Sequence, residues 1–204
     1  NGSAAYVASN GGTVSVIETA SALVTDTIAI AGASFIEITP DGATAYVASF
    51  GTNTVVPLDV VTGVAGTPIP VGSGPTGLAI SPDGSRLYVA NTWDGTVSAI
   101  DIATNTVITQ IAVGPRPFQL TVSPDNSEVW VAVGDINALA VIDAATLETV
   151  ATIAVGQNPR SVTISPDGTT ALAESYFDNA VTVVDVATRV VTSAISIGLN
   201  PVYV

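Results

Sequence analysis

Short runs of apolar residues, separated by polar turns, fill the chain. Between residues 74 and 113 there are four such runs: Leu78–Ser81, Arg86–Ala90, Thr96–Ile102 and Val107–Val113. Their period of two and their β-branched content are typical of strands. The segments between them contain Pro, Asp and Gly, which favour turns because Pro presets φ, Asp accepts backbone hydrogen bonds and Gly adopts positive φ. No segment combines a 3.6-residue period with capping residues, so the sequence predicts an all-β fold with essentially no helix.

The turn motif Ser-Pro-Asp-Gly at residues 81–84 recurs through the chain with small variations. Its prolines are 42 residues apart, at Pro40, Pro82, Pro124 and Pro166. The same step separates a set of aspartates (Asp59, Asp101, Asp143 and Asp185) and a set of large side chains (Tyr46, Tyr88, Trp130 and Leu172). A fixed period of this length indicates a repeat architecture. We expect the large side chains, together with Tyr6, to pack between repeats.

Four antiparallel strands in about 40 residues form one blade of a β-propeller. The sequence therefore predicts one propeller domain, 1–204, of about five four-stranded antiparallel blades, with repeats at approximately 1–40, 41–82, 83–124, 125–166 and 167–204. The chain begins just before the second strand of a repeat and ends in a segment, Leu199–Val204, that aligns with a first strand. We expect this last segment to pair with the strand around Tyr6 and close the ring, which would remove a free sheet edge. The alternative is that the chain is a run of repeats excised from a longer propeller ring.

Three segments carry a resemblance to a known family: residues 81–91 (SPDGSRLYVAN), 96–107 (TVSAIDIATNTV) and 111–117 (IAVGPRP). They resemble the YVTN-type β-propeller repeat. The likeness covers the whole chain and is weaker in the first and last copies, where YVAS (6–9) and LAES (172–175) replace YVTN. It implies a surface-layer, secreted or periplasmic protein, or a relative of the lactonases. Complete rings of this family mostly have seven blades, which five copies do not match.

The composition excludes several kinds of partner and site. The 204 residues carry a net charge of −13, with no Cys, Met, His or Lys and only four Arg. Nucleic acid is therefore not an expected partner, because its binding depends on cations that neutralise phosphates. The chain also has no apolar run near the roughly 20 residues of a membrane helix, so direct membrane insertion is not expected.

We expect ligands to bind on the face that carries two sets of loops, those leading into each first strand and those between the second and third strands. Arg116 and Arg160 lie in the first set, beside equivalent prolines, and could hold a carboxylate or phosphate by forked hydrogen bonds. The alternative is that each pairs with a nearby acid such as Asp94, Asp135 or Glu37.

The second set of loops carries aromatic residues on an otherwise polar background: Phe50, Trp93, Tyr176 and Phe177. Such rings suit carbohydrate stacking or a protein partner. Packing within the loops is the alternative.

Catalytic motifs are scarce. The chain has no nucleophile–His–acid set and no glycine-rich phosphate loop. No cofactor is predicted, although an oxygen-only Ca²⁺ site using Asp94, Asp135, Asn137 and Asp178 is conceivable. A lactonase-like activity, which the family resemblance implies, would need a metal cluster for which Glu37, Asn158, Asn200 and Glu174 are the candidates.

The sequence thus favours a non-catalytic binding or surface-display scaffold outside the cytoplasm, with a protein or carbohydrate partner at the cell surface. Its candidate binding residues are Arg116, Arg160, Trp93, Phe50, Tyr176, Phe177, Asn158 and Asn200. The alternatives are a lactonase-like or other metal-assisted hydrolase and a purely structural cell-surface repeat.

Overall fold

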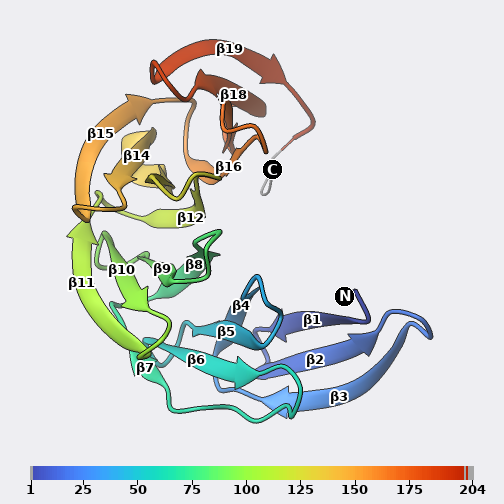
Figure 1. Ribbon diagram of the computed structural model, residues 1–204. Helices are drawn as coiled ribbons and strands as arrows, with labels where there is room; N and C mark the ends of the chain where they lie inside the picture. Colours follow the sequence, from blue (N-terminus) through green and yellow to red (C-terminus); the bar gives the residue numbers. More distant parts are fainter. Residues whose placement is uncertain (1, 200, 202–204) are drawn as a thin grey trace.

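A computed structural model describes residues 2–199 and 201. It contains five antiparallel sheets that follow one another in chain order around a common centre (Figure 1). We call them blades 1 to 5. Blade 1 has three strands and each of the others has four, which confirms the all-β propeller fold. One short 3-10 turn, Gly134–Ile136, interrupts the strands, and the described residues contain no helix that could span a bilayer.

The strands of each blade run outward from the centre in chain order. The first strands are innermost: β4 (Ala33–Ile38), β8 (Pro75–Ile80), β12 (Pro117–Val122) and β16 (Pro159–Ile164). The second strands are β1 (Ala4–Ser9), β5 (Thr44–Ser49), β9 (Arg86–Asn91), β13 (Glu128–Val133) and β17 (Thr170–Ser175). The third strands are β2 (Thr13–Glu18), β6 (Thr54–Asp59), β10 (Thr96–Asp101), β14 (Ala138–Asp143) and β18 (Ala180–Asp185). The outer strands are β3 (Leu23–Ala29), β7 (Ile69–Pro70), β11 (Thr106–Ala112), β15 (Glu148–Ala154) and β19 (Val190–Ser196).

Blades 1 and 5 stand at the two ends of an arc, and no strand pairing joins them among the described residues (Figure 1). Among the described residues, blade 1 contains its second, third and outer strands but no innermost strand. The expected closing pair would use Leu199–Val204, and most of that segment lies outside the described residues. Closure of the ring therefore stays a prediction.

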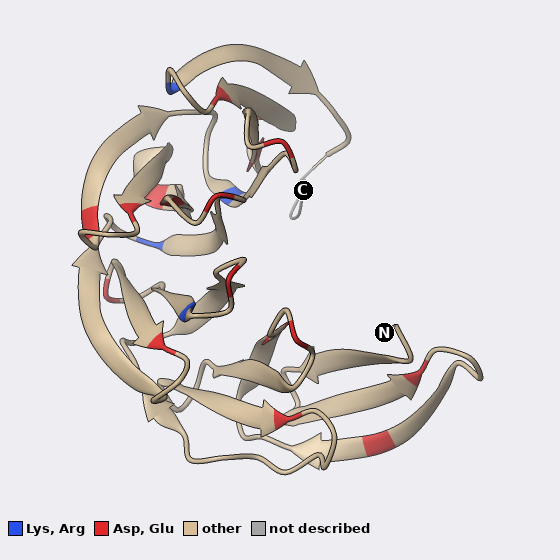
Figure 2. Ribbon diagram, in the orientation of Figure 1, with Lys and Arg blue, Asp and Glu red and all other residues tan. Residues whose placement is uncertain are grey.

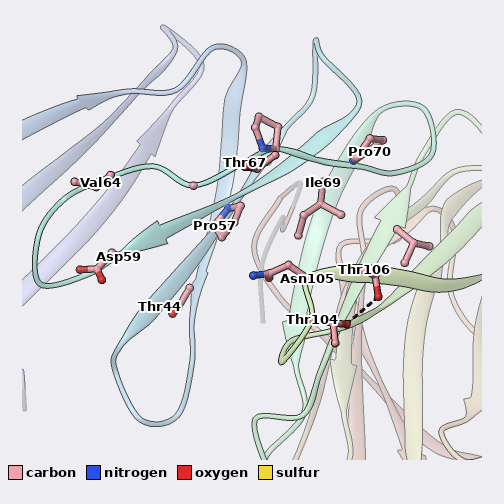
Figure 3. Close-up of a pocket in the computed structure, with 13 residues that line it drawn as sticks. Thr44, Pro57, Asp59, Val64, Thr67, Ile69, Pro70, Thr104, Asn105 and Thr106 are labelled. Atoms are coloured by element: carbon pink, nitrogen blue, oxygen red, sulfur yellow. Dashed lines mark hydrogen bonds between the residues drawn. The ribbon is translucent and has the colours of Figure 1, made fainter.

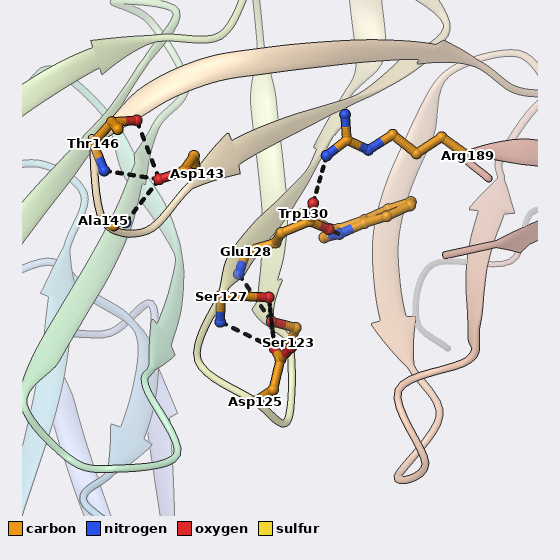
Figure 4. Close-up of polar contacts among 9 residues, drawn as sticks. All are labelled: Ser123, Asp125, Ser127, Glu128, Trp130, Asp143, Ala145, Thr146 and Arg189. Carbon is orange, nitrogen blue, oxygen red and sulfur yellow. Dashed lines mark hydrogen bonds and ion pairs between the residues drawn. The ribbon is translucent and has the colours of Figure 1, made fainter. Parts of the chain in front are cut away.

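The repeated motifs form the expected turns. In blade 3 the Asp83 carboxylate accepts hydrogen bonds from the Ser81 hydroxyl at 2.6 Å and from the Ser85 N–H at 2.9 Å, and Gly84 has φ of +71°. Blade 4 builds the same turn around Asp125, with Asn126 at the positive-φ position (Figure 4). These hydrogen bonds stabilise the ionised form, and they lower the pKa of Asp125 to about 2.

The core lies between blades, where three of the repeated large side chains are buried, while Tyr6 and Leu172 in the first and last blades are partly buried. Tyr46, Tyr88 and Trp130 each pack against the apolar face of the following blade. Every boundary also carries a polar contact between a second strand and the turn that follows the third strand of the next blade. The four contacts are Tyr6 Oη to the Val60 carbonyl, Tyr46 Oη to Asn105 Oδ1, Arg86 Nη1 to the Ala144 carbonyl, and Arg189 Nη2 to Glu128 Oε1 (the last in Figure 4).

Blade 2 departs from the expected four full strands. Its outer strand β7 is two residues long and pairs with β6 only at Thr54 and Val55. Pro57 lies in β6, and its carbonyl accepts a hydrogen bond from Gly66 N–H at 2.7 Å, so this position faces the outer strand. Because proline has no N–H to donate, a regular ladder cannot continue there. Residues 60–68 form a turn and an irregular segment that stays linked to β6 by the isolated bridge of Ala65 with Leu58. This segment borders a groove of about 830 Å³ between blades 2 and 3 (Figure 3).

Candidate functional site

Hydrogen bonds between neighbouring loops define one face of the propeller, which we call the loop face. The N–H groups of Phe50, Thr92, Gly134 and Tyr176, which follow the second strands, donate to carbonyls of Gly32, Gly74, Arg116 and Asn158, which precede the first strands. The two sets of loops are therefore adjacent in each blade, as the sequence predicts. The Ser-Pro-Asp-Gly turns lie at the opposite ends of the strands.

Acidic residues are spread over all five blades, whereas basic residues occupy few positions (Figure 2). Two of the four arginines, Arg86 and Arg189, are used in the contacts between blades described above. The other two, Arg116 and Arg160, lie on the loop face at the boundary of blades 4 and 5.

Arg116 occupies a position where an arginine is conformationally unfavourable. Its φ is +58°, and its counterparts in the other blades are Gly32, Gly74 and Asn158, which also have positive φ. Glycine and asparagine adopt this region more readily than a long side chain does. Leu147 and Arg189 have the same φ of +58° in turns, so it is the charge at this position, and not the backbone conformation, that sets Arg116 apart from the repeat.

Arg160 lies at an irregularity in β16. The pairing of β16 with β17 shifts between Pro159 and Ser161, so Arg160 is the extra residue of a β-bulge. Blades 2 to 4 have the same irregularity at the start of their first strands, so the bulge belongs to the repeat and only the arginine is particular to blade 5. The counterparts of Arg160 in blades 2 to 4 are Ser34, Thr76 and Phe118.

The two arginines surround one aromatic ring. The guanidinium carbons of Arg116 and Arg160 lie 5.4 and 5.3 Å from the centroid of the Phe118 ring, and Arg160 also lies 4.2 Å from the centroid of Tyr176. Arg160 Nε donates to Asn158 Oδ1 at 3.0 Å. We call Arg116, Phe118, Asn158, Arg160 and Tyr176 the arginine cluster. Cation–π contacts orient these guanidinium groups and leave N–H donors available for an anion.

Arg116 also forms an ion pair with Asp135 at 3.4 Å, as the alternative interpretation of this arginine predicts. Both side chains are about 40% exposed (42% and 41%), and such pairs contribute little free energy in water. Arg116 Nε is buried and has no hydrogen-bond partner among the described residues. The ion pair therefore leaves the donor capacity of Arg116 largely unused.

Glu174 lies next to this cluster, in β17, and is fully buried. Its counterparts are Ala8, Ala48, Ala90 and Ala132. Neither carboxyl oxygen has a hydrogen bond of regular geometry, although Ser161 and Arg160 lie close enough to influence the ionisation of the carboxyl group. Burial raises the pKa of Glu174 to about 7, and Ser161 and the Arg160 guanidinium oppose this rise. The carboxyl can therefore exchange a proton near neutral pH.

The aromatic residues of the loop face form two edge-to-face pairs. Phe50 and Trp93 have ring centroids 6.1 Å apart, across blades 2 and 3, and Tyr176 and Phe177 have centroids 5.2 Å apart in blade 5. Trp93 and Phe177 are exposed. Of these four rings, Tyr176 belongs to the arginine cluster, because the Arg160 guanidinium group lies over it.

The candidate metal ligands are spread over several blades. Asp94 and Asp178 each accept a loop N–H at 2.6 Å, from Ser73 and Gln157, and Asp135 faces Arg116. Glu37 lies in β4 beside a cavity of about 170 Å³ among the innermost strands, where burial raises its pKa. Within residues 2–199 and 201, no three acidic side chains gather closely enough to hold a metal ion. Asn200 lies outside the described residues.

The groove between blades 2 and 3 has a larger volume than the cavity beside Glu37, but several of its polar groups are already hydrogen-bonded, Thr104 and Thr106 to each other (Figure 3). Asp59 Oδ1 accepts the N–H groups of Val61 and Thr62, Asn105 Oδ1 accepts the Tyr46 hydroxyl, and the hydroxyls of Thr104 and Thr106 are 2.8 Å apart. These polar groups therefore already have hydrogen-bond partners, and the groove itself lies where the outer strand of blade 2 is short. The arginine cluster is therefore the stronger candidate site.

Comparison with known proteins identifies the family. The sequence matches the family described as "Lactonase, 7-bladed beta-propeller" over residues 3–113 and 67–193. The chain belongs to this family. The finer YVTN-type assignment rests on the repeat residues alone. A search of curated protein sequences finds no match.

Two solved structures illustrate the likeness. The hydrazine synthase of Kuenenia stuttgartiensis shares 32% identity with a TM-score of 0.78, over 81% of this chain and 49% of that one. A putative 6-phosphogluconolactonase of Bacteroides fragilis shares 22% identity with a TM-score of 0.83, over 100% of this chain and 70% of that one. The chain thus spans about half the length of the first protein. The second likeness, at this identity, shows the fold alone.

The sequence analysis named Arg116, Arg160, Asn158 and Tyr176 as candidates, and the structure brings them together; it did not name Phe118, whose ring both arginines contact. It also considered Glu174 only as a metal ligand. The signal that could have found both residues is departure from the repeat, because a structural role is copied in every blade and a site is not.

Proposed function

We propose that this chain carries the ligand-binding face of a lactonase-type hydrolase that acts on small anionic lactones. The observation that supports this proposal is the arginine cluster together with the neighbouring Glu174. At this one place in a propeller of the family, Arg116, Arg160 and Glu174 all depart from the repeat. The sequence alone favours the non-catalytic scaffold over the hydrolase. We prefer the hydrolase, because membership of the lactonase family supports it.

In this proposal the guanidinium groups of Arg116 and Arg160 hold a phosphate or carboxylate group of the substrate. The attacking water loses a proton to bulk water as its oxygen adds to the lactone carbonyl. The ring C–O bond then breaks, and the departing oxygen takes a proton from bulk water. Glu174 is fully buried beside Arg160, so its part in the proposal is to position that guanidinium group and not to transfer protons.

The experiment compares two lactones. 6-Phosphogluconolactone and gluconolactone differ by one phosphate, and their hydrolysis is followed by acid release at constant pH against the spontaneous rate. We expect faster catalysis for the phosphorylated lactone, and a loss of about 10- to 100-fold in kcat/KM for that lactone alone in Arg160→Gln. Equal rates for the two lactones in the wild-type protein, or an unchanged ratio in the variant, would contradict the proposal.

A rigid binding scaffold is the second candidate function. It is favoured by the exposed aromatic rings of the loop face, which no catalytic step requires. A scaffold would bind its ligand without any rate above the spontaneous one.

A further inference from the structure

Trp93 is an exposed tryptophan in a rigid setting. Its side chain is 61% exposed, whereas Trp130, the other tryptophan of the chain, is fully buried and donates its Nε1–H to Glu128. A large exposed aromatic ring is unusual on a folded surface and often marks a binding site when its position is fixed.

Hydrogen bonds among three loops fix the backbone that carries Trp93. Trp93 N–H donates to the Ser73 carbonyl at 3.1 Å, and the Asp94 carboxylate accepts the Ser73 N–H at 2.6 Å. Gly74 N–H donates to Asn53 Oδ1 at 3.0 Å, which ties in the loop of blade 2. The conformational entropy of this arrangement is therefore lost on folding and not on ligand binding.

The close approach of the indole to the backbone requires a glycine. A Cβ atom at Gly74 would lie 2.2 Å from Trp93 Cδ1, and Gly74 has φ of +67°. Phe50 supplies the second wall, with its ring 6.1 Å from the indole at an interplanar angle of 64°. The counterparts of Trp93 in blades 2, 4 and 5 are Gly51, Asp135 and Phe177, so this corner is not part of the repeat.

We propose that the corner of Phe50 and Trp93 is a subsite for neutral carbohydrate. A pyranose ring presents an apolar C–H face that can stack on the indole, while its hydroxyls reach the polar groups around it. Asp94 is exposed beside Trp93, and Thr52 and Asn53 are exposed beside Phe50. This subsite is formed at the boundary of blades 2 and 3, whereas the arginine cluster lies at the boundary of blades 4 and 5, and its proposed ligand does not depend on the proposed hydrolase activity.

Size and charge favour this ligand over others. A stable protein partner needs about 800 Å² on each side with an apolar centre, whereas this apolar patch consists of two rings within polar loops. The net charge of −13 disfavours an acidic glycan. One or two neutral sugar rings match the patch in both respects.

Intrinsic fluorescence tests the proposal directly, because the buried Trp130 is insensitive to a surface ligand and Trp93 is the sole other tryptophan. The probes are neutral hexasaccharides of β-1,4-glucose, β-1,4-N-acetylglucosamine, β-1,4-mannose and α-1,4-glucose, with oligogalacturonate as the acidic comparison. We expect a saturable change with at least one neutral probe, and none with the acidic one.

Variants separate this subsite from the other features of the loop face. Binding of the neutral probe, measured by calorimetry, should weaken at least about tenfold in Trp93→Ala. It should be unchanged in Phe177→Ala, a matched exposed aromatic in blade 5, and in Arg160→Gln. Thermal unfolding of Trp93→Ala checks that the variant is folded. No saturable binding by any neutral probe, or binding retained in folded Trp93→Ala, would overturn the proposal.

Discussion

At the scale of single residues, the informative positions are those where one blade differs from the rest. Glu174 is the clearest of these, because it places a carboxyl group in a buried position that is alanine in the four other blades. The folded protein holds the Glu174 proton up to a pH of about 7, whereas an ordinary glutamate releases it near 4.5. More protons are bound in the folded state between these values, so stability falls as pH rises through this range.

This pH dependence of stability gives a prediction for Glu174→Ala, which replaces the glutamate with the alanine found in the other blades. The variant should be more stable than the wild-type protein at pH 8, by on the order of 1 kcal/mol, and the difference should shrink towards pH 5. Urea unfolding at several pH values measures it, with the exposed Glu148→Ala as the control. Parallel stability–pH curves for Glu174→Ala and wild type would contradict the assigned pKa. Below pH 4 both proteins should lose stability together, because an aspartate of the unfolded chain binds a proton near pH 4 whereas folded Asp125 does so only near pH 2.

At the scale of elements, equivalent residues in different blades have different surroundings. Ile111 in β11 and Ile195 in β19 occupy the same register position, opposite Val97 and Val181. Ile111 is 5% exposed because the next blade covers it, whereas Ile195 is 53% exposed. One side chain thus belongs to the core of the propeller, and its repeat counterpart faces solvent.

The pair provides an internal control for the energetics of blade packing. Ile111→Ala should cost about 2–4 kcal/mol in the free energy of unfolding, since it leaves a cavity between blades. Ile195→Ala should cost less than about 1 kcal/mol. Denaturant unfolding of both variants measures the difference. Equal costs would mean that the outer face of blade 5 is covered in solution.

Much at the element scale could be predicted from the sequence. The period-two pattern and the Ser-Pro-Asp-Gly turns located the strands, and the step of 42 residues gave their grouping into blades. The first strands begin slightly earlier than predicted, at Pro75 in place of Leu78, because a bulge separates the first residue from the regular pairing. The short outer strand of blade 2 was missed because one proline, Pro57, outweighs a pattern that otherwise continues.

At the scale of the whole molecule, the site was only partly predictable. Arg116 and Arg160 are in separate repeats, and their common contact with Phe118 follows from how blades 4 and 5 pack. A single sequence shows which loops share a face but not which side chains converge on it. The distribution of cations becomes clear only in the fold: two arginines join blades, and the two others gather on the loop face of an otherwise acidic molecule.

The most direct test of the central claim is an NMR titration of the arginine side chains. The chain has four arginines and no lysine, so its Nε–H region should contain four signals. Arg116 Nε has no partner among the described residues and Arg160 Nε is bound only to Asn158, so an anion at the cluster should move these two signals. On addition of a small phosphate monoester we expect saturable shifts of Arg116 and Arg160, with Arg86 and Arg189 unmoved. Uniform small shifts of all four signals, or no shift at either cluster arginine, would contradict an anion-binding site on the loop face.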